Sequence, residues 1–127
     1  MQRVLGILIS FGLSVVVWAG ETISEGWLAK GTKWETPFYV RVSGQDGPTV
    51  VITGGIHGNE PAGARAAEQI RHWSITRGRL VVIPQANIPG LRDGTRFLPG
   101  EPPSRRDLNR QFPKTKMAAE AHGLLGK

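Results

Sequence analysis

Two residues with metal-binding side chains, His57 and Glu60, lie three positions apart in the stretch 54–63, Gly-Gly-Ile-His-Gly-Asn-Glu-Pro-Ala-Gly. The glycines of this stretch allow backbone angles that other residues avoid, so the imidazole and the carboxylate can converge on one point. Zinc, before other divalent metals, accepts such a pair of nitrogen and oxygen ligands. An isolated His-x-x-Glu occurs by chance in many sequences, so the neighbouring elements and a second motif must support a metal site.

The second polar motif, Arg-Asp-Leu-Asn-Arg-Gln-Phe-Pro, occupies residues 106–113. Arginine binds a carboxylate through two parallel hydrogen bonds, and a neighbouring asparagine adds an amide donor. Arg106, Asn109 and Arg110 are therefore candidates for binding an anionic substrate. On its own the motif would indicate only a charged loop.

The elements around the first motif place it at a ligand-binding position of an α/β sheet. Residues 50–53 and 80–83 are continuous apolar runs, which are typical of strands covered on both faces. Residues 61–73 between them show helical spacing, and this order predicts a right-handed crossover between two parallel strands. His57 and Glu60 then lie where the first strand leads into the helix, the edge at which open α/β sheets bind ligands.

The helix is expected to begin at a cap formed by Asn59, with Pro61 in its first turn. His72 lies outside its apolar stripe and is expected on the surface. The stripe expected to face the sheet comprises Ala62, Ala66, Ala67, Ile70 and Trp73.

The remaining segments are less regular. Residues 21–36 show no clear period and predict an extended lead-in. Residues 38–42 alternate between apolar and polar, which predicts a half-buried strand that forms a hairpin with residues 50–53. The segment 85–113 is rich in proline and arginine and predicts a long functional loop, and residues 116–125 predict a short helix.

The first twenty residues have the layout of a secretory signal peptide. Arg3 provides a positive start, residues 4–18 form an uncharged apolar run of fifteen residues, and Ala19 offers the small side chain that a signal peptidase reads. The run is short for a membrane-spanning helix, and an uncleaved anchor is the alternative. We therefore expect residues 1–20 to be removed and residues 21–127 to form part of one domain in the periplasm or outside the cell, without a stable membrane anchor.

The composition narrows the possible partners. Sixteen Lys and Arg against ten Asp and Glu give a net charge of +6, and much of the excess lies between residues 92 and 116. A basic loop beside a metal-binding turn would attract anionic substrates, and the same charge could also form a solvated face or a nucleic-acid surface. No aromatic interleaving or nucleic-acid motif accompanies the charge, so no nucleic-acid partner is expected. The chain has no cysteine, which excludes a lipoprotein anchor and disulfides.

With both motifs in order, residues 36–113 resemble the zinc carboxypeptidase superfamily, and most of all its succinylglutamate desuccinylase/aspartoacylase branch. The resemblance implies an α/β fold of the zinc-carboxypeptidase (phosphorylase/hydrolase-like) type, with a mixed sheet and covering helices. It also implies that His57 and Glu60 are the first two zinc ligands and that Asn109 and Arg110 hold the substrate carboxylate.

In this family an upstream arginine polarises the scissile carbonyl. Arg96, followed by Phe97, matches that arginine best, although its distance to Arg110 is long and Arg105 or Arg106 are the alternatives. The implied reaction is zinc-assisted hydrolysis of an amide bond next to a carboxylate, of the deacylase or the carboxypeptidase type. Its substrate would be a small molecule or a peptide. A non-catalytic anion-binding module on the same fold is the alternative function.

The chain departs from the family pattern after the second motif. A third zinc ligand, a histidine, and a general-base glutamate are implied well beyond it, but only fourteen residues follow Pro113. His122 and Glu120 lie too close to serve, and Lys114 replaces the usual glycine. We therefore expect a truncated product, incomplete at its C-terminus, that binds zinc weakly, hydrolyses nothing on its own, exposes a sheet edge and tends to aggregate.

Overall fold

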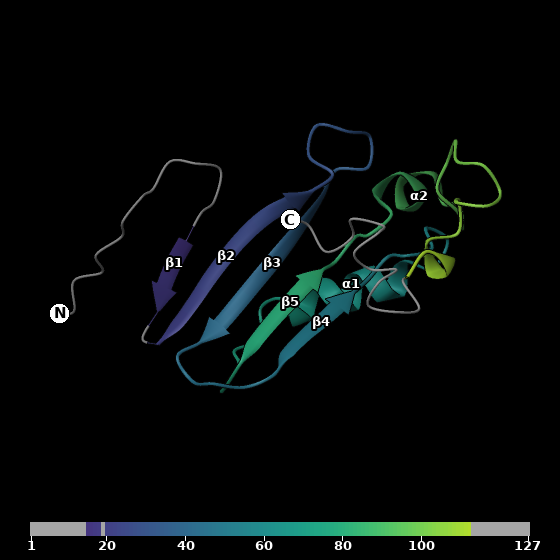
Figure 1. Cartoon of the computed structure of the whole chain (residues 1–127). Helices are drawn as coiled ribbons and strands as arrows, with labels where there is room; N and C mark the ends of the chain where they lie inside the picture. The colour runs from purple at the N-terminus through teal and green to yellow at the C-terminus, as the bar shows by residue number, and fades with distance from the viewer. Residues whose placement is uncertain (1–14, 19, 113–127) are drawn as a thin grey trace.

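The computed structural model describes residues 15–18 and 20–112, which form a five-stranded mixed sheet with two short α-helices (Figure 1). The strand order is β1-β2-β3-β5-β4; β4 and β5 are parallel and the other pairs are antiparallel. This confirms the predicted α/β class with a mixed sheet. The strands are β1 (Val15–Trp18), β2 (Glu21–Leu28), β3 (Thr36–Ser43), β4 (Thr49–Thr53) and β5 (Arg79–Ile83).

Several predictions fall on the N-terminal and C-terminal ends of the chain. The helix predicted at 116–125, together with Lys114, Glu120 and His122, lies outside the described residues, as do residues 1–14 and Ala19 of the predicted signal peptide. The last part of that predicted peptide, Val15–Trp18, forms β1 and pairs with the start of β2. No described helix has the length and apolar character that crossing a membrane requires.

Strand β2 replaces the extended lead-in predicted for residues 21–36. Its polar and apolar residues do not alternate regularly, so the strand is fixed by its eight-residue pairing with β3 rather than by its own pattern. Gly26 shows how closely the two strands pack, because a Cβ at this position would overlap the ring of Phe38.

The predicted hairpin between β3 and β4 is wrong, because β5 lies between these two strands. The connection that follows β3 contacts the start of β5 instead of closing a two-strand turn. Its carbonyls at Gln45 and Pro48 accept hydrogen bonds from the N–H groups of Gly78 and Arg79, at 2.8 and 2.9 Å. These bonds attach the connection to the start of β5, which lies between β3 and β4 in the sheet.

Helix α1 (Pro61–Ile70) covers the sheet beside β4 and β5. Residue 60, not Asn59, precedes its first turn, and no side chain caps it. Its buried positions are Ala64 and Ala67. The helix ends at Ile70, so Trp73, which was predicted on its apolar stripe, lies beyond the helix and is 62% exposed. Ala62 and Ala66 are also exposed, contrary to the prediction. The core under this helix consists of Ala67, Leu80 and Val82, with Ile52, Ile70 and Ile75 packed against it.

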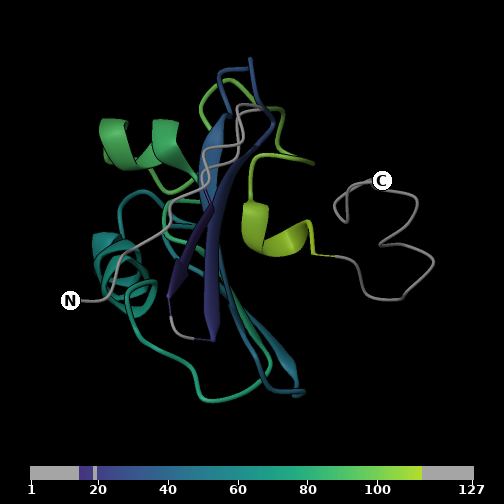
Figure 2. The same ribbon diagram turned by 90° about the vertical axis from the view of Figure 1, so that its left-hand side faces the viewer.

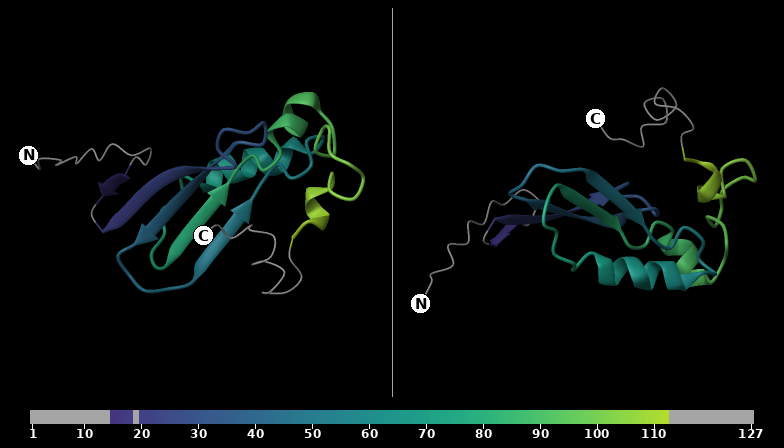
Figure 3. Two further views of the ribbon diagram at one scale, coloured as in Figure 1. Left: turned by 45° about the horizontal axis from the view of Figure 1, so that its top comes forward. Right: turned by 90° about the horizontal axis from the view of Figure 1, so that it is seen from below.

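The segment predicted as a structureless loop at 85–113 contains two short helices. Helix α2 (Ile88–Asp93) begins after Asn87, whose side chain accepts a hydrogen bond from the N–H of Gly90, and a 3-10 helix, η1, spans Leu108–Arg110. An asparagine followed two residues later by proline is a helix-start signal that the sequence carried. Figures 2 and 3 show α1 and α2 on one side of the sheet and η1 on the other.

Strand β4 forms the edge of the sheet among the described residues, with Val50 48% and Val51 60% exposed. The prediction that this strand is covered on both faces is therefore wrong for this part of the chain. Within residues 15–18 and 20–112 this edge is exposed, as predicted. Apolar side chains on an unpaired edge promote association between copies.

Replacing Val51 with lysine is expected to reduce self-association, because a charge on an edge strand opposes strand pairing between copies. The free energy of unfolding should change by only about 0.5 kcal/mol, since the side chain is largely exposed. Light scattering over a concentration series measures the effect. The control Gln69→Lys adds the same charge on an exposed face of α1, and equal association of the two variants would contradict a role for the β4 edge.

Candidate functional site

The turn that follows β4 carries the predicted metal ligands at the carboxyl end of the parallel strands (Figure 3). Gly54 continues the ladder by donating to the carbonyl of Ile83 at 2.8 Å. Gly55 then takes a φ of 62°, a left-handed value that favours glycine, and turns the chain away from the sheet. A hydrogen bond of 3.1 Å from the N–H of Glu60 to the carbonyl of His57 closes the next turn before α1.

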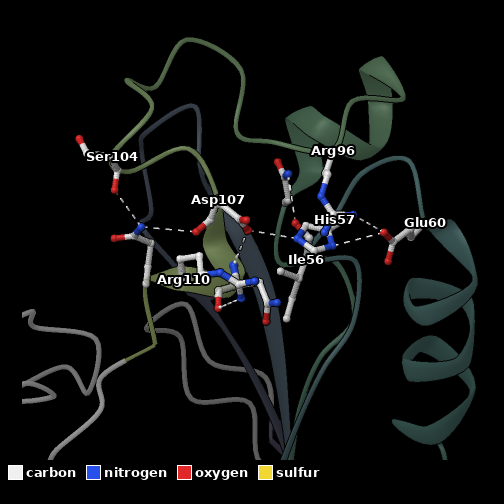
Figure 4. Close-up of polar contacts among 10 residues, drawn as sticks. Ile56, His57, Glu60, Arg96, Ser104, Asp107 and Arg110 are labelled. Atoms are coloured by element: carbon white, nitrogen blue, oxygen red, sulfur yellow. Dashed lines mark hydrogen bonds and ion pairs between the residues drawn. The ribbon is translucent and has the colours of Figure 1, made fainter.

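His57 and Glu60 converge, as their spacing suggested (Figure 4). His57 is only 8% exposed, and its Nδ1 lies 3.4 Å from Oε1 of Glu60. The side chain of Glu60 is 58% exposed.

The separation of these two atoms fits a shared zinc ion. Two ligand atoms that each lie about 2.0–2.2 Å from one tetrahedral zinc are roughly 3.3–3.6 Å apart. The 3.4 Å between His57 Nδ1 and Glu60 Oε1 falls in this range. Residues 15–18 and 20–112 contain no cluster of three His, Cys, Asp or Glu side chains that could complete a site. The donor set therefore fits two of the three protein ligands that a catalytic zinc takes.

Asp107 supports the imidazole from the opposite side, a role that sequence reasoning missed. Its Oδ1 lies 3.1 Å from Nε2 of His57 (Figure 4) and also accepts a hydrogen bond from the N–H of Asn109. The hydrogen bond with His57 is the main cause that holds the pKa of the Asp107 carboxyl below its usual value, and the backbone bond from Asn109 adds to it. An ionised carboxylate only accepts hydrogen bonds, so Asp107 favours a proton on Nε2, and in a neutral imidazole with that proton Nδ1 is the nitrogen free to bind a metal.

Replacing Asp107 with asparagine is expected to weaken zinc binding by about 10–100-fold, because an amide orients the imidazole less firmly and leaves it less basic. Zinc titration followed by calorimetry measures the change. Glu101→Gln is the matched control, since it removes another carboxylate of the same loop, one paired with Arg105 at 3.7 Å. Equal zinc affinity in wild type and Asp107→Asn would show that Asp107 does not support a metal ligand.

Arg96, predicted as catalytic, and Asn109, predicted to bind substrate, both lie near the metal-binding turn. Arg96 reaches the metal-binding turn, where its Nη1 lies 2.6 Å from Oε1 of Glu60. Asn109 lines an open pocket of about 430 Å³ together with His57 and Glu60. Arg110 follows it in η1 with an exposed guanidinium, whose Nη1 donates to the carbonyl of Asn109 at 3.5 Å.

Arg105 and Arg106 lie farther along the same loop and are engaged there. The guanidinium of Arg106 stacks on the ring of Phe97 at 4.5 Å. Arg105 pairs with Glu101, and its side chain is 71% exposed. Of the three arginines considered for the carbonyl-polarising role, Arg96 is the one whose side chain meets a residue of the metal-binding turn.

Comparison with known proteins points to a single family. The profile of the succinylglutamate desuccinylase/aspartoacylase catalytic domain matches residues 46–124. An N-alpha-acetyl-L-2,4-diaminobutyric acid deacetylase of Halomonas elongata is 34% identical over 71 residues, which are 54% of this chain and 20% of that protein.

Two solved structures extend the likeness. A succinylglutamate desuccinylase/aspartoacylase from Rhodobacter sphaeroides superposes with a TM-score of 0.55 at 32% identity, over 72% of this chain and 29% of that one. An aspartoacylase family protein from Mesorhizobium loti gives a TM-score of 0.61 at 25% identity, over 92% of this chain and 41% of that one. The chain thus spans less than half the length of these relatives.

Proposed function

The chain belongs to the succinylglutamate desuccinylase/aspartoacylase catalytic-domain family, and on this basis we propose that it forms part of the site of a zinc-dependent deacylase. The family is one of zinc-dependent, deacylase-type hydrolases. The observation that carries the proposal is the 3.4 Å approach of His57 Nδ1 to Glu60 Oε1, with Asp107 bonded to the other imidazole nitrogen.

In this proposal His57 and Glu60 hold the zinc ion. When bound, zinc supplies an acidified water and polarises the carbonyl of the scissile amide. Asp107 keeps the proton of His57 on Nε2 and so presents the lone pair of Nδ1 to the metal side. The third protein ligand and the general base are expected from polypeptide other than the described residues.

The substrate class follows from the polar groups around the pocket. The side-chain amide of Asn109 and the guanidinium of Arg110 bind a carboxylate beside the scissile bond. Arg96, which lies next to Glu60, offers a positive charge to the oxyanion that develops on the carbonyl. An N-acyl amino acid has this combination of an amide next to a carboxylate, and the Halomonas elongata relative is a deacetylase of such a compound by its name.

A non-catalytic anion-binding module is the second candidate. One observation favours it: Glu60 already pairs with Arg96 at 2.6 Å. In that case the arginines and Asn109 would bind a carboxylate without turnover, and zinc would play no part.

The test is hydrolysis of N-acetyl and N-succinyl amino acids, measured by mass spectrometry. The chain is assayed alone and joined to the portion of the Rhodobacter sphaeroides relative that it does not span. We expect the joined protein to cleave these substrates, to stop after chelation, to recover with zinc and to spare analogues without the carboxylate. Substrate binding that is indifferent to chelators, without cleavage, would overturn the proposal in favour of the anion-binding module.

We also propose that the protein is exported from the cytoplasm. The support for export is the apolar run at 4–18 that follows Arg3. Removal of residues 1–20 would take away β1, and β2 would become the edge of the sheet. N-terminal sequencing of the protein after expression in a bacterial host tests this: a periplasmic product that begins near Glu21 supports export, and an intact N-terminus in the cytoplasm refutes it.

A further inference from the structure

Asn87 is the most completely buried polar side chain of the described residues, with 0% exposure, and nothing in the proposed mechanism uses it. Its amide has two partners from different segments. Nδ2 donates to the carbonyl of Ile56 at 3.3 Å, and Oδ1 accepts from the N–H of Gly90 at 2.9 Å. One side chain therefore joins the metal-binding turn to the first turn of α2.

The backbone around Asn87 strengthens this junction. The N–H groups of Ala86 and Asn87 donate to the carbonyls of Gly54 and Gly55 at 2.9 and 3.0 Å. Together with the side-chain bond to Ile56, these bonds engage three consecutive carbonyls directly before His57. The peptide plane that leads into His57 is fixed as a result.

The other atom of the amide, Oδ1, fixes the start of the segment that carries Arg96. By accepting from Gly90, Oδ1 caps α2, which ends at Asp93 and leads to Arg96 beside Glu60. Gly90 itself must lack a side chain, because a Cβ there would overlap the amide of Asn87. The same buried group thus sets both the ligand turn and the start of the segment that carries the arginine.

We propose that Asn87 is a positioning residue. Its buried amide bridges the metal-binding turn and α2, and so fixes the position of His57 relative to Arg96. The proposal rests on the proposed zinc site for its functional consequence. It acts through the carbonyl of Ile56 and the cap of α2, and Asn87 itself does not touch the ligand pocket.

Asn87→Ser separates the two bonds, because serine still caps α2 through Gly90 but is too short to reach the carbonyl of Ile56. We expect zinc affinity, measured by calorimetry, to fall about tenfold or more. Hydrogen exchange of the turn at 54–60 should become about tenfold faster, while α2 keeps its protection. Asn87→Asp, which caps α2 and in its ionised form cannot donate to Ile56, should give the same pattern if the serine variant folds poorly.

The control is Thr36→Val, which removes one buried hydrogen bond to the same segment, from Oγ1 to the carbonyl of Gln85 at 2.6 Å. It should lower stability without changing zinc affinity or exchange at 54–60. The proposal is overturned if the Asn87 variants keep wild-type affinity and exchange, or if Thr36→Val matches their losses. If the wild-type protein binds no zinc through His57, the proposed function fails, and the exchange comparison still decides whether Asn87 holds the turn.

Discussion

Replacing Gly58 with alanine is expected to destabilise the fold by about 3 kcal/mol or more, because the turn and α2 would have to separate. A Cβ at Gly58 would overlap the backbone of Gly90 and the N–H of Leu91. A backbone contact cannot relax as a flexible side chain does. Thermal unfolding followed by circular dichroism should show a fall in melting temperature of roughly 12–24 °C for a domain of this size.

Gly63→Ala provides the matched control. A Cβ at Gly63 meets only the backbone nitrogen of Gly55, at an ordinary 3.8 Å, and the residue lies inside α1. Alanine is favoured over glycine in a helix by about 0.5–1 kcal/mol, so this variant should be as stable as the wild type or slightly more. Equal melting temperatures for the two variants would show that the turn does not pack against α2 as described.

Replacing His57 with alanine is expected to lower the zinc affinity of this site about 100-fold or more, because one of only two described ligands is removed. The same change leaves Asp107 without its imidazole partner, so some loss of stability should accompany it. Zinc titration by calorimetry, together with circular dichroism to confirm the fold, measures both effects.

His72→Ala is the control for histidine loss. His72 is exposed and lies beyond the end of α1. Its Nε2 is 3.7 Å from Oε1 of Glu68, a residue of α1 outside the metal-binding turn. Its removal should leave zinc binding unchanged. If both variants bind zinc as the wild type does, the metal does not bind through His57. If both variants lose zinc binding, the binding is not specific to the turn that carries His57.

The local parts of the site could be predicted from the sequence. His57 and Glu60 belong to one short turn between a strand and a helix, so their convergence depends on neighbouring backbone angles alone. The parallel pairing of β4 and β5 likewise follows from one strand-helix-strand unit. Patterns within a few residues carry this information.

Contacts between distant segments could not be predicted in the same way. Asp107 lies fifty positions from His57. The motif that contains Asp107 predicted roles only for its arginines and its asparagine. The place of β5 between β3 and β4 depends on bonds from the connection at 44–48 to Gly78 and Arg79, which no local period reveals. Asn87 was missed although its helix-start pattern was present, because proline-rich composition suggested a loop.

Burial was the property that apolar runs predicted least well. Strand β4 has the composition of a central strand, but its Val50 and Val51 are exposed at the sheet edge of the described residues. On α1, Ala67 packs so closely against Gly54 that a Cβ at Gly54 would overlap it, whereas Trp73 lies beyond the end of the helix and is exposed. The apolar stripe predicted through Trp73 therefore extends past the helix that packs on the sheet.

The most direct test of a shared zinc ion is anomalous X-ray diffraction from crystals grown with zinc. We expect a single strong peak about 2.0–2.2 Å from both Nδ1 of His57 and a carboxylate oxygen of Glu60, with Asp107 still bonded to Nε2. A peak on the Nε2 side of His57, or no peak within ligand distance of Glu60, would contradict the zinc site proposed for this turn.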